Sequence, residues 1–261
     1  MRTFRAVSMV VVVSLVVLAA SAGAAPKNKP DNDSELLKRE QELGTLDEEI
    51  AKQRAELPWV PVEKEYTFDT EEGPKTLPEL FDGRSQLLIY HLMFGPSYEV
   101  ACPGCTALAD HLDGALPHVN YRDVTLMCMS RAPIEKLAAY KKRMGWTFPY
   151  VSSGRNDFNL DWGFAMTEEQ MASPEMAEMV NHPPDWLQEW SRNVGTELAL
   201  GMRESPGWNV FAMEDGVVYH TYSRIAPDRF LVEPYFGQLL DQVPSGRGSV
   251  EDFPLLRHDE Y

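Results

Sequence analysis

The sequence of 261 residues is poor in cysteine and in positive charge. It has three cysteines, Cys102, Cys105 and Cys128, which cannot all pair within one chain, so a small scaffold held together by disulfides is excluded. Lysine and arginine number 24 against 40 aspartates and glutamates, which gives a net charge of -16. Because such a surface repels phosphate backbones, we do not expect nucleic acid as a partner.

Long apolar runs are also scarce, and the one candidate lies at the start of the sequence. Arg2 and Arg5 precede the apolar run 6–20, and the small residues 22–24 follow, which is the order of a secretory signal peptide. We predict cleavage after Ala24 and export to the periplasm or the extracellular space. The run is shorter than the roughly 20 residues that a membrane-spanning helix needs, so no stable span is expected after cleavage. An uncleaved N-terminal anchor is the alternative.

Residues 25–58 predict a polar leader followed by an amphipathic helix. From Ser34 onward, leucines and Ile50 recur at roughly helical spacing among charged residues, and the pattern ends before Pro58. We expect this helix to pack on the main domain as an arm. A coiled coil with a partner is the alternative, but the heptad repeat is too short to favour it.

Residues 59–261 predict one α/β domain. The helices and strands expected from periodicity and turn signals are a hairpin around Gly73-Pro74, a helical turn at 77–81, buried strands at 86–94 and 123–129, helices at 106–112, 133–144 and 228–243, a mostly helical insertion at 167–200, and a hairpin of 208–213 with 217–223. The order β-α-β-α-β-β-α around a central mixed sheet resembles the thioredoxin fold.

The segment Cys102-Pro103-Gly104-Cys105 stands at the start of the first helix after a central strand. Free backbone N–H groups and the positive end of a helix dipole stabilise a thiolate at such a position. In a pair of this kind the first cysteine attacks and the second resolves the mixed disulfide. The spacing therefore predicts Cys102 as nucleophile and Cys105 as resolving thiol.

Several longer segments resemble one bacterial family, the one filed as domain of unknown function 899. They include LPWVPVEKEYTF, TLPELFDGRSQLLIYHLMFGPSYEVACPGCTALADHLDG, RDVTLMCMSRAPIEKLAAYKKRMGWTFPYVSS and the ending RHDEY, and the resemblance runs from about Leu36 to Tyr261. The resemblance implies a thioredoxin-like fold. Ordinary thioredoxins, however, place a cis-proline before the hairpin, where this sequence has Gly207-Trp208-Asn209-Val210, with Pro206 nearby but too early. This difference argues against general protein-disulfide reduction. Pro96 and Ser97 are reminiscent of peroxiredoxins, but their spacing to the cysteines does not fit that motif.

The leading hypothesis is an exported thiol-disulfide oxidoreductase that uses no cofactor. Its substrate is a protein disulfide, a small thiol or disulfide, or a peroxide, and its reductant or oxidant is unknown. The competing hypothesis is a non-catalytic thioredoxin-fold binding protein whose disulfide fixes a loop. A zinc site is disfavoured, because His91, His111 and His118 lack the usual paired spacing.

Other candidate residues have a structural alternative beside the functional one. Arg131 ends the second buried strand and is predicted to lower a thiolate pKa or hold an anion, or else to pair with Glu135. Cys128 lies in an apolar strand and is expected to be buried and inert. The remaining candidates are Tyr90, His91 and Tyr98 near the same sheet edge, and the carboxylates Asp157 and Asp161 with the terminal residues 258–261, for which packing and solvated surface are the expected roles.

Overall fold

The structure is a computed structural model that describes residues 34–225, 239–244 and 256–261, and it divides the chain into units 1–55 and 56–261. In the first unit the described part is helix α1 (Ser34–Ala55), which has no buried residue. The predicted helix is therefore present, whereas its packing as an arm stays a prediction. The predicted signal peptide lies outside the described residues. No helix within the described ranges is long and apolar enough to cross a membrane.

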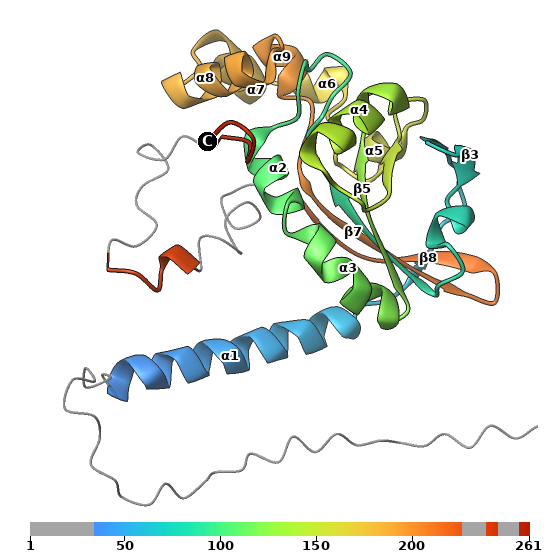
Figure 1. The fold of residues 1–261 in the computed structure, drawn as a ribbon. Coiled ribbons are helices and arrows are strands. Elements are labelled where there is room, and N and C mark those ends of the chain that lie inside the picture. Colours follow the sequence, from blue (N-terminus) through green and yellow to red (C-terminus); the bar gives the residue numbers. More distant parts are fainter. Residues whose placement is uncertain (1–33, 226–238, 245–255) are drawn as a thin grey trace, which may run out of the picture. The chain divides into compact units, whose positions relative to one another are not determined.

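The second unit contains the predicted α/β domain (Figure 1). Its elements, in chain order, are β1 (Val60–Pro61), β2 (Thr67–Thr70), β3 (Gly73–Thr76), η1 (Pro78–Phe81), β4 (Gln86–His91), α2 (Pro103–Ala109), α3 (Leu112–Tyr121), β5 (Val124–Ser130), α4 (Ile134–Met144), β6 (Tyr150–Ser152), α5 (Phe158–Asp161), α6 (Glu168–Met171), α7 (Pro174–Asn181), α8 (Asp185–Val194), α9 (Leu198–Gly201), β7 (Gly207–Glu214) and β8 (Val217–Ile225). Helices α6 to α9 make up the predicted insertion. The predicted closing helix at 228–243 lies mostly outside the described residues.

The strand order confirms the predicted thioredoxin-like fold. The sheet has the order β1-β8-β7-β4-β5-β6-β2-β3. Strands β4 and β5 are parallel and are joined by a helical crossover, whereas β7 is antiparallel to β4 and β8 is antiparallel to β7. The arrangement β8-β7-β4-β5 is that of the thioredoxin fold. The β7–β8 turn has Asp215 and Gly216 at φ 51° and 79°, as a two-residue type I′ hairpin requires.

Helix α3 and strand β6 are among the elements that were not predicted; β1 and α5 are others. Helix α3 contains Gly114 and Pro117, two residues that disfavour helix interiors, and its buried Leu112 anchors it to the core instead. Strand β6 is only three residues long, but it pairs in parallel with β5 and receives β2 at a single register position, Asp69 opposite Ser152. Helix α3 and strand β6 are stabilised by tertiary contacts rather than by a local pattern.

The sheet carries one apolar layer on each face. On β4, Leu87 and Ile89 point into one layer, with Phe158 and Phe211. Tyr90 points into the other layer, which is closed by side chains of α2 and α4 and contains all three cysteines. The candidate thiols are therefore set in the packed layer between the sheet and its helices.

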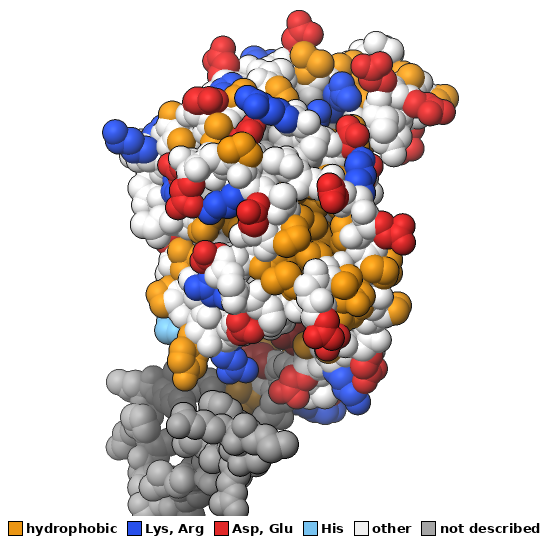
Figure 2. Space-filling model, turned by 90° about the vertical axis from the view of Figure 1, so that its right-hand side faces the viewer, with side chains coloured by type: hydrophobic (Ala, Val, Ile, Leu, Met, Phe, Trp, Pro, Cys, Tyr) orange, Lys and Arg blue, Asp and Glu red, His pale blue; other side chains and the backbone are white. Residues whose placement is uncertain are grey.

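The face of the molecule drawn in Figure 2 is mixed in charge. Figure 2 shows acidic and basic side chains interspersed on one face of the molecule, with hydrophobic side chains gathered between them. No broad field of one sign appears on that face.

Candidate active site

Cys102 is the N-cap residue of α2, and Pro103 occupies the first helical position. Proline suits that position because its fixed φ is helical and its missing N–H would have no partner there. The Cys102 N–H donates to the Met93 carbonyl at 3.0 Å, and the carbonyl of Cys102 accepts from both the N–H and the hydroxyl of Thr106, at 2.9 and 3.0 Å. These bonds hold the Cys102 sulfur at the amide end of the helix.

The surroundings of the Cys102 sulfur favour the thiolate. The pKa of Cys102 is lowered from 9.0 to about 6, first by the hydrogen bond from the Cys105 thiol, against the opposing effect of burial. The backbone amides of Cys105 and Gly104 and the indole of Trp190 lower the pKa further. Amides opening a helix thus face the sulfur, as the sequence predicted. Cys102 as a whole residue is only 9% exposed.

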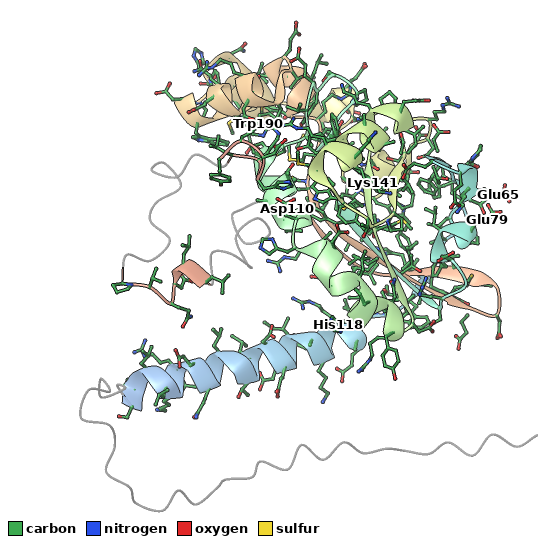
Figure 3. All side chains as sticks on the ribbon, in the orientation of Figure 1. Glu65, Glu79, Asp110, His118, Lys141 and Trp190 are labelled. Carbon is green, nitrogen blue, oxygen red and sulfur yellow. The ribbon has the colours of Figure 1, made fainter. Side chains whose placement is uncertain are left out.

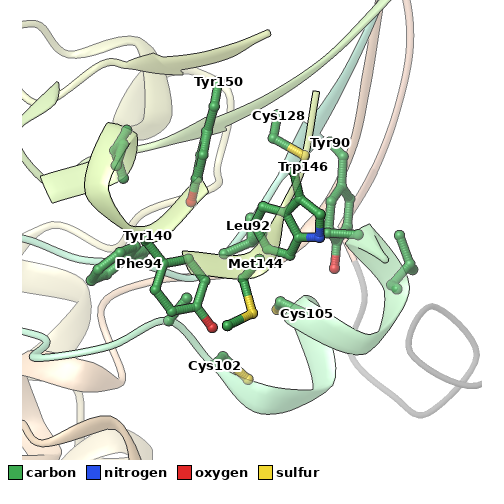
Figure 4. Close-up of a cluster of buried hydrophobic side chains, with 14 of the residues drawn as sticks. Tyr90, Leu92, Phe94, Cys102, Cys105, Cys128, Tyr140, Met144, Trp146 and Tyr150 are labelled. Atoms are coloured by element: carbon green, nitrogen blue, oxygen red, sulfur yellow. The ribbon is translucent and has the colours of Figure 1, made fainter. Parts of the chain in front are cut away.

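The surroundings of Cys105, in contrast to those of Cys102, favour the protonated thiol. Cys105 is 1% exposed, and its pKa is raised well above the usual value, first by its hydrogen bond to Cys102 and then by burial. The two thiols are free and lie together with Tyr90 and Cys128 in the core layer shown in Figure 4. A nucleophilic thiolate beside a protonated partner is the state that thiol–disulfide exchange requires before attack.

Trp190 is a site residue that sequence reasoning missed. It belongs to α8 of the insertion, and its indole N–H donates to Cys102 Sγ at 3.4 Å. In Figure 3 Trp190 lies on the side of the insertion that faces α2. The Tyr98 ring packs edge-on against Trp190, with centroids 5.8 Å apart, and the Tyr98 hydroxyl donates to the Gly201 carbonyl at 2.7 Å. The insertion therefore supplies a hydrogen-bond donor to the Cys102 sulfur.

The final residues of the sequence also reach this region, beside the start of α2 (Figure 1). Arg257 is 3% exposed and donates to the carbonyl of Ala101, the residue before Cys102, at 3.2 and 2.7 Å. Glu260 accepts from Arg257 and also from Arg143 of α4. Asp259 and Glu260 lie on the exposed surface, as expected for these carboxylates, and Glu260 also pairs with the buried Arg257 and with Arg143.

Arg131 does not contact the cysteines through any bond that the structure shows. Its guanidinium pairs with Glu204 at 2.8 Å, and the two side chains are 18% and 5% exposed. The predicted structural pairing of Arg131 with Glu135 is therefore wrong, because Arg131 pairs with Glu204 instead. Burial raises the pKa of Glu204, and the charge of Arg131 opposes this. The electrostatic role predicted for Arg131 stays a prediction.

A family model described as "Bacterial protein of unknown function (DUF899)" matches residues 28–261. The chain belongs to the DUF899 family. Among curated proteins, no significant match exists.

Solved structures similar to the DUF899 chain include three described as peroxiredoxin-type proteins. The bacterioferritin comigratory protein of Xanthomonas campestris, described for its alkyl peroxide reduction activity, has a TM-score of 0.40 and 13% identity, covering 61% of this chain and 79% of its own. PrxQ of Xylella fastidiosa has a TM-score of 0.42 and 11% identity, covering 67% of this chain and 87% of its own. The peroxidoxin BcpB of Mycobacterium tuberculosis has a TM-score of 0.36 and 16% identity, covering 44% of this chain and 69% of its own. Likenesses this distant transfer no activity or site residue to the DUF899 chain.

Three further candidates of the DUF899 chain, Cys128, His91 and Asp161, have surroundings that suit a structural role. Cys128 is fully buried, and burial raises its pKa well above the usual value, which agrees with an inert thiol. His91 lies on the opposite face of the sheet and stacks on Phe164 with centroids 3.7 Å apart; burial lowers its pKa to about 3. Asp161 binds Lys64 and Tyr66 at 2.6 and 2.8 Å. Within the described ranges no three His, Cys, Asp or Glu side chains gather as a metal site.

Gly207 is the first residue of β7, in the region where a cis-proline is expected from the resemblance to thioredoxins. No cis peptide bond occurs in the described part of the DUF899 chain. A Cβ on Gly207 would stand 2.2 Å from the Arg224 carbonyl oxygen, so the neighbouring strand approaches too closely for any side chain. The described residues therefore contain no counterpart of the thioredoxin cis-proline.

Proposed function

We propose that this DUF899 protein is an exported thiol-disulfide oxidoreductase in which Cys102 attacks and Cys105 resolves. The observation that carries the proposal is the Cys102 sulfur at the start of α2, where helix amides, the Cys105 thiol and the Trp190 indole lower its pKa to about 6. At neutral pH such a cysteine is mainly thiolate, which is the attacking species.

The proposed reaction has two exchange steps. The Cys102 thiolate attacks one sulfur of a disulfide substrate, forming a mixed disulfide and releasing one substrate thiolate. Cys105 then loses its proton and attacks Cys102 Sγ, which forms the Cys102–Cys105 disulfide and releases the second thiolate. The substrate is reduced by two electrons, the pair is oxidised, and a separate thiol reductant must restore it. Run in reverse, the same steps oxidise a dithiol.

Cysteine variants test this proposal directly. Cys102→Ser should abolish turnover of a small disulfide, whereas Cys105→Ser should release one thiolate and stop as a mixed disulfide, seen by intact mass. Cys128→Ser is the matched control and should retain turnover, because its thiol is inert. Retained activity in Cys102→Ser would defeat the proposal. A Cys102 pKa near that of free cysteine, about 8.5, without turnover would favour the binding protein with a fixed loop.

The low exposure of Cys102 favours a second candidate, a thiol peroxidase. A cysteine residue that is 9% exposed, with the Trp190 indole against its sulfur, admits a small hydroperoxide more readily than a folded protein. Here the thiolate attacks the terminal peroxide oxygen, the O–O bond breaks, and an alcohol or water leaves. The sulfenic acid then condenses with Cys105, releasing water and forming the same disulfide. Peroxide consumption compared with disulfide consumption by one preparation separates the two candidates.

Export is part of the proposal, because disulfide chemistry persists outside the cytosol. Mass spectrometry of the protein from its native host should show a mature N-terminus after Ala24. The reduction potential of the pair then gives the direction of electron flow, since values near about −270 mV mark reductants and values near about −120 mV mark oxidants.

A further inference from the structure

Tyr90 lies beneath the cysteine pair on the central strand β4. It is fully buried, stands in register with Cys128 of β5, and packs against Trp208 of β7 with ring centroids 4.9 Å apart. Its side chain enters the same apolar layer as Cys102 and Cys105. Figure 4 shows its hydroxyl oxygen near α2, on the side of Cys105.

The Tyr90 hydroxyl makes no hydrogen bond of normal geometry to the described residues, although the Cys105 side chain lies close enough to interact with it. Three other tyrosines of this layer are satisfied: the hydroxyl of Tyr98 donates to the Gly201 carbonyl, that of Tyr140 pairs with Thr106, and that of Tyr150 pairs with Ser130. An unpaired hydroxyl in an apolar layer lowers folding stability, and a phenylalanine ring would fill the same space without that cost. Packing alone therefore gives no reason for the hydroxyl.

Cys105 is the group that this hydroxyl faces. Burial raises the pKa of Tyr90 well above its usual value, and the charge of Cys105 is the next cause. The pKa of Cys105 is raised by Cys102 and by burial, and both the Met93 amide and Tyr90 act in the lowering direction. With both groups protonated no hydrogen bond of normal geometry joins them, so the contact gains strength only when the Cys105 sulfur becomes negative.

We propose that Tyr90 is a catalytic residue of the resolving step, whose hydroxyl donates a hydrogen bond to the Cys105 sulfur as that thiol loses its proton. This inference rests on the proposed function. In the step concerned, the Cys105 proton leaves to solvent, and the Cys105 thiolate, held by Tyr90 O–H and Met93 N–H, attacks Cys102 Sγ of the mixed disulfide. The new Cys102–Cys105 bond forms as the bond to the substrate sulfur breaks, and the substrate leaves as a thiolate. Tyr90 keeps its own proton throughout.

The aromatic disulfide dithiobis(nitrobenzoate) separates the two steps, because each releases one coloured thiolate. In stopped-flow measurements on the reduced full chain, the fast phase reports attack by Cys102 and the second phase reports resolution by Cys105. Tyr90→Phe should leave the first phase unchanged and slow the second roughly tenfold or more, the scale of one lost hydrogen bond to a charged group. The mixed disulfide should accumulate by intact mass, and the second phase should shift to higher pH.

A stability measurement distinguishes this role from a structural one. Removal of an unpaired buried hydroxyl should leave the midpoint of urea unfolding unchanged or raise it, even as resolution slows. Tyr150→Phe is the matched control: it removes a hydrogen-bonded hydroxyl from the same layer, so it should lower stability and leave both phases intact. Wild-type resolution in Tyr90→Phe would overturn the inference. Release of both thiolates by Cys102→Ser would instead overturn the proposed function.

Discussion

Trp190 donates its indole N–H to Cys102 Sγ at 3.4 Å, which joins an inserted helix to the first residue of the Cys-Pro-Gly-Cys segment. The donor and the acceptor are 88 residues apart in the sequence. Local structure at the start of α2 therefore accounts for only part of the reactivity of Cys102.

Trp190→Phe keeps most of the aromatic packing and removes the N–H. We expect the pKa of Cys102 to rise, because the thiolate loses one donor, and alkylation near pH 6 to slow by about fivefold. Trp186→Phe is the control, since Trp186 lies on the same helix but is 63% exposed. An equal effect of both variants would show that helix packing, and not the indole donor, sets the thiol reactivity.

The pH dependence of alkylation tests the thiolate at Cys102. Because the pKa of Cys102 is lowered to about 6, its reaction with iodoacetamide should reach half its limiting rate near that pH and level off well below the pKa of free cysteine, about 8.5. Cys105 and Cys128 should stay unmodified in the folded protein, since their pKa values are raised. Mass mapping of the labelled peptide checks both statements.

The same titration is linked to folding. A cysteine whose pKa is lower when folded than when unfolded adds stability that is complete above the unfolded pKa and disappears as the pH falls through the folded pKa. The difference in unfolding free energy between the reduced protein and Cys102→Ser should therefore change between about pH 8.5 and pH 6, favouring the wild type at the upper end. Urea unfolding at several pH values measures it. A difference that does not change with pH would contradict the lowered pKa.

The buried pair of Arg131 and Glu204 should matter for stability. Arg131→Ala leaves Glu204 buried without its cation, which is expected to cost about 3–5 kcal/mol of unfolding free energy. Adding Glu204→Gln should recover part of the loss. Arg155→Ala breaks a pair whose arginine is 82% exposed, so it should change stability by less than about 0.5 kcal/mol. A raised Cys102 pKa in Arg131→Ala would instead support the electrostatic role predicted from sequence.

Glycine substitutions test the close approach of β7 and β8. Gly207→Ala should lower stability by about 1–3 kcal/mol, because the new Cβ meets a carbonyl oxygen of the partner strand at 2.2 Å. Gly114→Ala is the control: it lies within α3 with open space around the new methyl group, so it should raise stability by up to about 1 kcal/mol. Thermal unfolding of both variants decides the comparison.

The sequence predicted the elements whose burial or turn chemistry is local. The apolar run of β4, the Asp-Gly hairpin and the cysteines at the start of α2 follow from periodicity and turn residues. Helix α3 was not predicted because it contains Gly114 and Pro117, which disfavour a helix, and tertiary contacts outweigh them. Strand β6 was not predicted because it is only three residues long and is held by its pairing with β5.

The contacts that complete the site could not be predicted in the same way. Trp190 resembles any aromatic residue of an amphipathic helix until α8 docks against α2. The bond from Arg257 to the Ala101 carbonyl spans 156 residues, and no local pattern marks it. The same holds for the pairing of Arg131 with Glu204 across 73 residues.

The contact between Trp190 of α8 and Cys102 links the chemistry of the thiol to the folding of the insertion. We expect the pKa of Cys102 to reach its full lowering only after α8, which lies between β6 and β7, has packed against α2 and brought Trp190 to the sulfur. Heat, a ligand or proteolytic cleavage that loosens α8 should therefore raise the pKa of Cys102 and slow its reactions, while the central sheet stays folded. The rate at which Cys102 reacts with an alkylating reagent would then report the local stability of the insertion that contains α8.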